Sequence, residues 1–514
     1  MIDDEALIVV SPIAGGDNGS AVGESAVASA TNVPSALPQG RAKRTLTWWR
    51  LGMITFVFTC SGPGGLEQVV KAGGPLLALV GIFVMPVVYV VPQVVVVAEL
   101  ASMMPTNAGC VWWVYRGFGR FAGFYSAWTC AISNMVDCAG YPLFIVEYIS
   151  SSYYTDMPFW SVKVPLRLGF LAFGTAASLA STKDLSNVAT AGFAVTVVII
   201  VTVFFRSTPN IRPAAQWAYI NDVASLDYSL LGSSLLWMYT GWATLGSLAG
   251  EVTGTRVLYQ GMTAALSLDV FVYTTALLAS LTVAEAGLWD AGYISVCFNR
   301  VLVGIGPYFG AAVIFSSCIL FVSVLVCYSR SLWGMASLGW IPRIFTKELS
   351  TGAPHVAVFA HVFVAVCLMW FDFSFIVQVE YTLSAASDIM MDASFLRLRY
   401  IDAAAERPYR VPGGKAVAWI ITLLKVLVVG GTCVAGLLQW RVLVAFLGVN
   451  VGVCLGYAGL RYYQPQQPLP STLTGSPNRS IGDGDEVEEG QVSDNEFELK
   501  PTRTARDEDT TMKA

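Results

Sequence analysis

Long apolar runs constrain the fold of this chain more than any motif does. A helix needs roughly 20 mostly apolar residues to cross the hydrocarbon core of a bilayer, and about twelve such runs follow one another here. We expect them at 49–71, 75–104, 120–149, 165–182, 185–207, 227–249, 258–284, 305–333, 354–371, 374–398, 417–438 and 441–462. Charged residues make up only 13% of the chain, which is about half the share in a soluble protein. The sequence therefore predicts an all-α membrane protein that crosses the bilayer many times.

The distribution of lysine and arginine predicts the orientation. Most of the cations that flank the runs fall on one side of the predicted membrane: Arg41, Lys43, Arg44, Arg116, Arg120, Lys183, Arg256, Arg343, Lys347, Arg397, Arg399, Arg407, Arg410 and Lys415. Cytoplasmic loops carry such an excess, so we expect both termini in the cytoplasm. The plasma membrane is the expected location, and an internal membrane is the alternative that the sequence leaves open.

The two ends of the chain differ from the transmembrane domain that we expect at 45–463. Residues 1–44 are rich in Ala, Ser, Gly and Val, and residues 464–514 in Asp, Glu, Ser, Thr and Pro. Neither segment can bury enough apolar surface to fold. Both are predicted to be disordered cytoplasmic tails, and the second is acidic.

Two of the predicted spans are interrupted in their middle. The first contains the run from Ser61 to Gly65, with three glycines and Pro63, and the sixth contains the run from Tyr239 to Trp242. In a helix interior a glycine costs about 1 kcal/mol and a proline about 3 kcal/mol, so such a break is tolerated at membrane depth where it lines a cavity. A kink or close helix packing is the alternative for each break.

The positions of the two breaks predict an architecture. They correspond if spans 1–5 and 6–10 are inverted repeats, in which discontinuous helices form a substrate site near the bilayer midplane. We therefore expect a five-plus-five inverted repeat with two additional helices and with helices 1 and 6 discontinuous. The main chain at Ser61, Gly62 and Gly64 is included in the predicted substrate site.

Carboxylates inside the apolar runs are candidate binding groups, because a charge at membrane depth is costly and is kept for function. Glu67 lies one turn beyond the first break. Asp137 lies near the middle of the third span and shares a helical face with Asn134 and Tyr141. The hypothesis is that Asp137 and Glu67 bind a cationic substrate; a structural hydrogen-bonded carboxylate is the alternative for Asp137.

Aromatic side chains gather at the second break, where Trp237, Tyr239 and Trp242 follow closely on one another. An ammonium group over such a ring gains roughly 0.5 to 2 kcal/mol. Glu380, in the outer part of the tenth span, could hold the far ammonium group of an extended substrate. Lipid contact or helix packing is the alternative for each aromatic residue.

Three further aspartates lie inside the predicted spans. Asp388 and Asp392, four residues apart on the tenth span, are expected to serve a cytoplasmic gate with Arg397 or Arg399. Asp269 in the seventh span has no assigned role.

Glu99 and Glu251 lie near predicted cytoplasmic span ends. We expect each to pair with nearby arginines.

Several motifs resemble those of the amino acid-polyamine-organocation superfamily, and most closely those of the polyamine uptake permeases of plants and trypanosomatid protozoa. The motifs are Ser61 to Glu67, Ala72 to Leu79, Ala98-Glu99-Leu100, Met104-Pro105, Asp137 with Tyr141 and Pro142, Ala249 to Val252, Ala393 to Arg399, and Arg407 to Pro412. The resemblance implies the inverted-repeat fold, alternating access, and import of putrescine, cadaverine or spermidine that is commonly driven by the proton gradient. It also implies that Trp237 closes over the substrate.

Pro63 favours a diamine over an amino acid as the substrate. The amino acid's carboxylate would be held by main-chain N–H groups of the broken first helix, and Pro63 lacks one of these donors. A cationic or neutral amino acid permease or exchanger of the same fold remains the alternative, and a nutrient sensor that signals through the tails is a further one.

Other partners are not expected. An exchanger with a glycoprotein subunit would be supported by a cysteine in the loop 150–164, and that loop has none, so no obligatory protein subunit is predicted. The chain shows no Ser/His/Asp set, phosphate loop or metal-ligand cluster, and His355 and His361 are its only histidines. We therefore expect no enzyme activity, no metal, no cofactor and no nucleic-acid partner.

Overall fold

The computed structural model describes residues 48–60, 62–104, 109–154, 157–180, 185–212, 216–218, 220, 226–242, 255–285, 287–337 and 339–463. Within these ranges every regular element is a helix. Among the described residues, eight stretches are long and apolar enough to cross a bilayer: Pro75–Met103, Arg120–Tyr153, Phe159–Leu179, Ala191–Asn210, Gln260–Leu281, Ile305–Ser337, Gly414–Leu437 and Trp440–Gly459. The predicted tails 1–44 and 464–514 lie outside the described residues.

The helices follow the predicted apolar runs. In the first half of the chain they are α1 (Trp48–Thr59), α2 (Leu66–Gly73), α3 (Pro75–Met85), η1 (Pro86–Val90), α4 (Val91–Met103), α5 (Gly109–Phe118), α6 (Arg120–Tyr153), η2 (Phe159–Lys163), α7 (Val164–Leu179), α8 (Leu185–Ser207), η3 (Thr208–Asn210) and α10 (Tyr228–Met238). The second half contains α12 (Thr255–Leu281), α13 (Tyr293–Val301), α14 (Ile305–Ser337), η7 (Arg343–Thr346), α15 (His355–Leu368), α16 (Phe373–Ile401), α17 (Gly414–Leu437) and α18 (Trp440–Tyr463).

The break in the first predicted span is confirmed. α1 ends at Thr59 and α2 begins at Leu66, and between them Gly62 and Gly65 have φ of 90° and 84°. Glycine adopts this left-handed region without the steric cost that a Cβ would bring. In the sixth span α10 ends at Met238, but residues 243–254 are outside the described part. The total of twelve spans and the inverted repeat therefore stay predictions.

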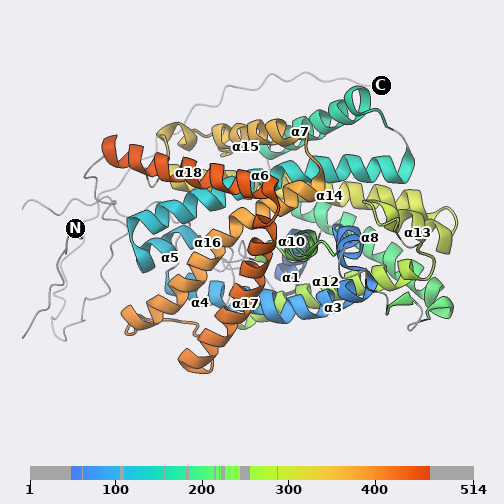
Figure 1. Ribbon diagram of the computed structural model, residues 1–514, viewed down its shortest axis with the longest axis horizontal. Coiled ribbons are helices and arrows are strands. Elements are labelled where there is room, and N and C mark those ends of the chain that lie inside the picture. The colour runs from blue at the N-terminus through green and yellow to red at the C-terminus, as the bar shows by residue number, and fades with distance from the viewer. Residues whose placement is uncertain are drawn as a thin grey trace, which may run out of the picture. The chain divides into compact units, whose positions relative to one another are not determined.

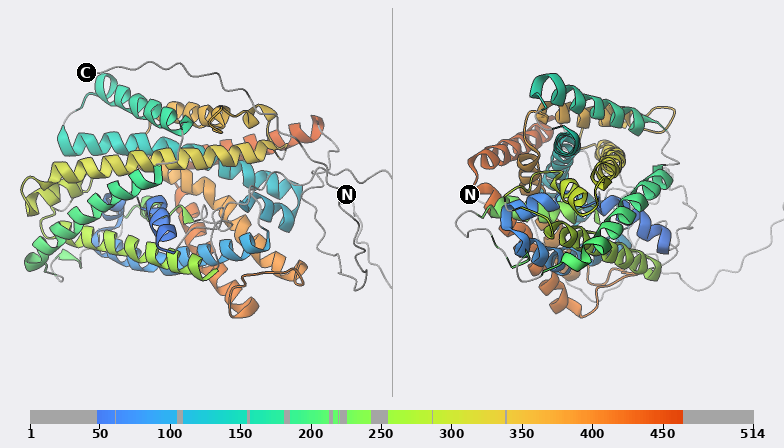
Figure 2. Two further views of the ribbon diagram at one scale, coloured as in Figure 1. Left: turned by 180° about the vertical axis from the view of Figure 1, so that it is seen from behind. Right: turned by 90° about the vertical axis from the view of Figure 1, so that its right-hand side faces the viewer.

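Two long helices form the centre of the bundle. Most of the spanning segments of α6 and α14 are buried inside the protein. Most of the spanning segments of α17 and α18 lie on its surface. α16 packs along α6, α1 packs on α12, and α2 packs on α10, which Figure 1 shows end-on near the middle of the bundle. α7 and α15 lie side by side and both contact α6, as the two views of Figure 2 show. The broken first span is thus split between two partner helices.

A buried ion network joins α4 to the end of α16. The Glu99 carboxylate receives Arg399 Nε at 2.9 Å and is also bonded by Arg399 Nη2. Arg407 Nε lies 3.3 Å from Glu99 Oε1, and the Val411 amide donates to Oε2 at 2.8 Å. The predicted pairing of Glu99 with arginines is confirmed; Glu251 lies outside the described residues.

A second buried pair corrects the predicted gate on α16. Lys425 Nζ of α17 lies 3.1 Å from each carboxylate oxygen of Asp392, and both side chains are almost fully buried. Arg399 forms its ion pair with Glu99, and the Arg397 guanidinium lies over the ring of Phe118. The expected contact of Asp392 with Arg397 or Arg399 is therefore wrong, because the side chain points toward α17 and its lysine.

Asp388 lies one helical turn before Asp392. It is half-buried, and within the described residues no arginine forms an ion pair with it. The gate contact predicted for Asp388 is therefore not found in this part of the chain.

Candidate functional site

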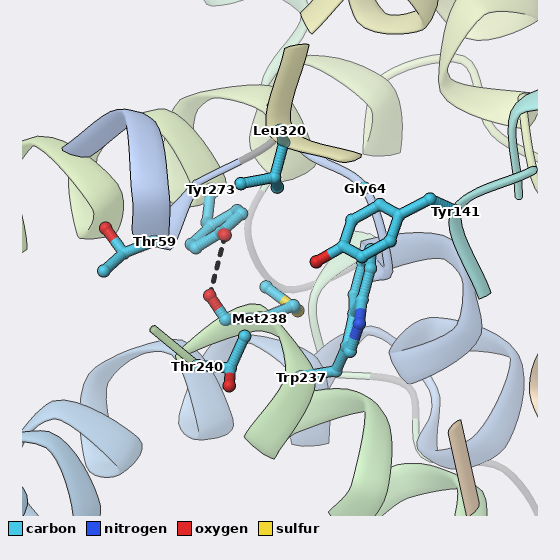
Figure 3. Close-up of a pocket in the computed structure, with 8 residues that line it drawn as sticks. All are labelled: Thr59, Gly64, Tyr141, Trp237, Met238, Thr240, Tyr273 and Leu320. Atoms are coloured by element: carbon cyan, nitrogen blue, oxygen red, sulfur yellow. Dashed lines mark hydrogen bonds between the residues drawn. The ribbon is translucent and has the colours of Figure 1, made fainter. Parts of the chain in front are cut away.

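A small cavity lies at both helix breaks. Its lining residues come from five helices and the two breaks: Thr59, Gly64, Tyr141, Trp237, Met238, Thr240, Tyr273 and Leu320. Figure 3 shows these residues around the space between α1, α6, α10, α12 and α14, with the Tyr141 hydroxyl and the Leu320 side chain pointing into it. The cavity volume of about 10 Å³ is enough for about one water molecule. In this conformation the helices are thus closed around the site.

Asp137 supplies a buried anion beside this cavity. Its carboxylate accepts hydrogen bonds from Trp237 Nε1 at 3.3 Å and from the Tyr328 hydroxyl at 3.0 Å. Tyr141, one turn further along α6, lines the cavity itself. Asp137 and Tyr141 of α6 thus both contact Trp237 at the end of α10.

The Trp237 indole forms the centre of an aromatic cluster. Its ring centroid lies 6.1 Å from that of Tyr141, 5.9 Å from Phe144 and 5.2 Å from Phe373. The first break packs against the same indole, because a Cβ added at Gly65 would lie 2.9 Å from Trp237 Cε3. Main chain from one break therefore touches a ring from the other.

Glu380 is a second buried carboxyl group in this region. It projects from α16, is 7% exposed, and interacts electrostatically with Asp137 and Asp388. Among the described residues no lysine or arginine forms an ion pair with Asp137 or Glu380. Two carboxyl groups without a basic partner are thus held in one part of the core.

Glu67 makes a contact elsewhere. It is fully buried, and its Oε1 accepts a hydrogen bond from the Gly292 amide at 3.3 Å. Gly292 immediately precedes α13. Glu67 is not among the cavity-lining residues, so its carboxyl group links α2 to the start of α13 instead of facing the cavity.

Two aromatic residues of the second break are packed into the core. The Tyr239 hydroxyl donates to the Ile82 carbonyl at 2.7 Å, and its ring meets Tyr273 edge-on. Trp242 is 1% exposed, and its Nε1 has no hydrogen-bond partner among the described residues. Neither lines the cavity.

Of the remaining predicted site residues, some lie at the cavity and others do not. Gly64 lines the cavity and Gly62 is buried beside it in the break. Asn134 is partly buried and its Nδ2 lies 3.8 Å from Cys130 Sγ on its own helix. Ser61 lies outside the described residues.

Six residues of the site were missed in the sequence: Met238 and Thr240 of the cavity wall, and the four named next. Thr59, Tyr273 and Leu320 line the cavity, and Tyr328 bonds Asp137. The Tyr273 hydroxyl also donates to the Met238 carbonyl at 2.9 Å, where α10 ends (Figure 3). Because α12 and α14 are apolar around most of their circumference, their sequences do not indicate which side faces the cavity.

Comparison with known proteins points to one family. A family model described as amino acid permease matches residues 46–451. Polyamine transporter RMV1 of Arabidopsis thaliana is 29% identical over 379 residues, which cover 72% of this chain and 76% of the relative. Polyamine transporter PUT1 of Oryza sativa subsp. japonica is 29% identical over 389 residues, covering 74% and 72%. An uncharacterized transporter of Legionella pneumophila is 23% identical over 362 residues, covering 65% and 77%.

Proposed function

Because this chain belongs to the amino acid permease family, and is thus a multi-pass membrane transporter and not an enzyme, we propose that it imports polyamines of the putrescine class. Import proceeds by alternating access in an inverted-repeat fold and is coupled to protons. The proposal places the protein in the plasma membrane with both termini in the cytoplasm. Relatives named polyamine transporters support the substrate class.

The observation that carries the substrate assignment is that Asp137, bonded to a cavity-lining side chain, and Glu380, which interacts with it electrostatically, have no basic partner among the described residues. Leaving a charge buried and unpaired is costly, so Asp137 and Glu380 suit a ligand that brings two positive charges. A diamine has two ammonium groups and no carboxylate. Asp137 holds one of them, and Glu380 holds the other.

The aromatic cluster supports the same substrate. An ammonium group bound at Asp137 would lie next to the rings of Trp237 and Tyr141, since Trp237 bonds Asp137 and contacts Tyr141. Cation–π attraction to such rings is worth up to about 2 kcal/mol when the cation is desolvated. The methylene chain between the two ammonium groups needs only apolar contact, which residues such as Leu320 and Met238 offer.

Substrate entry requires movement of the cavity walls. Room for about one water cannot hold a four-carbon diamine. The wall formed by Trp237 is the one that moves, because this side chain closes the cavity while it bonds Asp137. A bound ammonium group would replace the indole N–H as the partner of the carboxylate.

The first experiment measures uptake of radiolabelled putrescine into proteoliposomes that carry the purified full-length protein. Putrescine uptake that an inward proton gradient stimulates is the expected result, with arginine as a parallel label. Uptake of arginine alone would contradict the proposal and favour the amino acid permease of the same fold.

The assignment of Asp137 is tested with Asp137→Asn, which keeps the shape and removes the charge. Loss of a charged hydrogen bond is worth about 1.5–3 kcal/mol, so the apparent affinity for putrescine should fall roughly 10- to 100-fold. Glu285→Gln is the matched control, because Glu285 is an exposed residue of the connector before α13 and pairs with the partly exposed Arg300. Unchanged affinity and rate in Asp137→Asn would remove Asp137 from the site.

Glu380→Gln tests the second ammonium subsite with ligands of different charge. Inhibition of uptake by n-butylamine, which has one ammonium group, should be nearly unchanged in this variant, whereas inhibition by putrescine should weaken about 10-fold or more. Asp137→Asn should weaken inhibition by both n-butylamine and putrescine. Equal losses for both ligands in Glu380→Gln would argue against a separate subsite.

A further inference from the structure

Another buried carboxyl group lies next to the first helix break and has no part in the contacts described so far. Asp269 of α12 is fully buried. Its Oδ2 accepts a hydrogen bond from the Thr59 hydroxyl at 3.0 Å, and its Oδ1 has no hydrogen-bond partner among the described residues. Thr59 is the last residue of α1 and lines the cavity. Asp269 therefore touches the cavity wall through one hydroxyl group.

The Thr59 hydroxyl has two acceptors at the same distance. Its Oγ1 lies 3.0 Å from the Thr55 carbonyl oxygen and 3.0 Å from Asp269 Oδ2. A threonine hydroxyl has one hydrogen to donate and can also accept. When Asp269 is charged, Thr59 can turn its hydrogen toward the carboxylate. When Asp269 is protonated, the carboxylic acid can donate to Thr59, which then donates to Thr55. Both protonation states of Asp269 are thus provided with a hydrogen bond.

The surroundings of Asp269 favour uptake of a cation. The titratable groups that act on it or are acted on by it are Cys60 at the end of α1, Tyr239 after α10, and Tyr273 on α12 itself. In the described part of the chain no lysine or arginine pairs with it. The negative end of the α1 dipole also lies at Thr59. An unpaired carboxylate is therefore costly here.

Asp269 is separate from the substrate anion. Asp137 contacts Trp237, and Figure 3 shows Trp237 and Thr59 on different sides of the cavity. Asp269 also interacts electrostatically with Tyr273, one turn along α12, whose hydroxyl donates to the Met238 carbonyl at the second break. A change at Asp269 can thus reach the ends of both broken helices, which form walls of the substrate cavity.

We propose that Asp269 is the proton-binding site that couples transport to the proton gradient, with Thr59 as the hydroxyl group that reports its protonation to the first helix break. This rests on the proposed polyamine import. The carboxylate takes one proton from the outer solution to become a carboxylic acid, and it releases the same proton to the cytoplasm, so one proton moves per cycle through this group. Because Asp137 and Glu380 bind the substrate, taking up the proton does not remove a substrate anion.

The test compares driven uptake with exchange in proteoliposomes. Asp269→Asn carries an amide in place of the protonated acid. We expect it to keep exchange of external labelled putrescine for internal unlabelled putrescine at equal pH, while stimulation by an inward proton gradient falls to about onefold. Glu285→Gln is again the matched carboxyl-to-amide control and should keep both activities.

The possible results separate this inference from the proposed function. Gradient stimulation retained in Asp269→Asn would overturn the role of Asp269 and leave polyamine import standing. Loss of exchange in a folded Asp269→Asn protein would also overturn it, because the residue would then be needed for binding. Absence of putrescine uptake in the unchanged protein would remove the proposed function itself. Stimulation of the unchanged protein by a sodium gradient at equal pH would overturn the choice of a proton.

A second pair of variants decides the matter if Asp269→Asn does not fold. Thr59→Val deletes a hydrogen bond to the charged carboxylate and a weaker one to the carboxylic acid. The charged form loses more, so half-maximal uptake should shift to higher external pH by about one unit. Thr59→Ser keeps the hydroxyl and should restore the pH profile. Identical pH profiles in Thr59→Val and Thr59→Ser would contradict the proposal.

Discussion

At the scale of single residues, the first break depends on a glycine for two independent reasons. Gly65 has a φ of 84°, which disfavours any side chain, and a Cβ there would lie 2.9 Å from the Trp237 ring. A left-handed conformation costs a residue with a Cβ about 1–2 kcal/mol. The forced contact with Trp237 adds roughly 1–3 kcal/mol, as overpacking of a core does.

We predict that Gly65→Ala lowers the thermal unfolding temperature and strongly reduces putrescine uptake. Gly287→Ala is the matched control, since Gly287 has a φ of 87° but no atom within 4 Å of the added Cβ. It should lose only the backbone contribution of about 1 kcal/mol and keep transport. The two variants are compared by unfolding in detergent and by uptake; equal effects would show that contact with Trp237 has no role.

Residue chemistry also shows what the sequence could indicate about the site. Asp137, Tyr141 and Trp237 could be identified because acids and rings are conspicuous in apolar helices. Glu67 was expected in the site because it lies one turn beyond the break. Each residue turns a helix by about 100°, so closeness in sequence does not determine which way a side chain points. The Glu67 side chain faces Gly292. Thr59 could not be singled out, because a threonine in a membrane helix commonly bonds its own main chain.

At the scale of elements, helix positions followed the apolar runs closely, whereas contacts between helices did not. The run predicted at 185–207 coincides with α8 (Leu185–Ser207), because length and apolarity determine where a membrane helix lies. Which faces of two helices meet depends on rotation about their axes. A helix that is apolar around its circumference leaves that rotation open, which is why the partner of Asp392 on α17 was not predicted.

The Lys425–Asp392 pair should make α16 and α17 depend strongly on each other. Removing one member of a buried ion pair costs about 3–5 kcal/mol, because the other charge stays buried without a partner. Lys425→Met should therefore be strongly destabilising. Adding Asp392→Asn should recover part of the loss. The free energy of unfolding of both single variants and of the double variant tests this coupling, and simple additivity would contradict it.

At the scale of the whole helical unit, the strongest electrostatic link described is the Glu99 network. It connects α4 with the end of α16 and with the connector to α17, through Arg399, Arg407 and the Val411 amide. Arg399 also donates to the Gly414 carbonyl at 2.7 Å, at the start of α17. Segments about 300 residues apart in sequence are thereby held at one point.

Glu99→Gln should destabilise the protein by about 3–5 kcal/mol, since two buried guanidinium groups would lose their anion. Asp402→Asn is the control, because Asp402 pairs with the exposed Arg116 at 3.0 Å. A surface pair contributes at most about 1 kcal/mol. Unfolding of both variants in detergent should show a clear difference, and equal stabilities would indicate that the Glu99 network is not a major tie.

The small cavity between the helix breaks does not conduct ions in this conformation. Space for about one water molecule cannot hold a continuous file of waters, so this cavity offers protons and inorganic ions no aqueous path between the helix breaks. Among the described residues around the cavity, the voltage across the membrane then falls over packed protein. Current should flow only as the charged cargo is carried through in discrete cycles, and a bilayer containing the protein without substrate should conduct no better than the lipid alone.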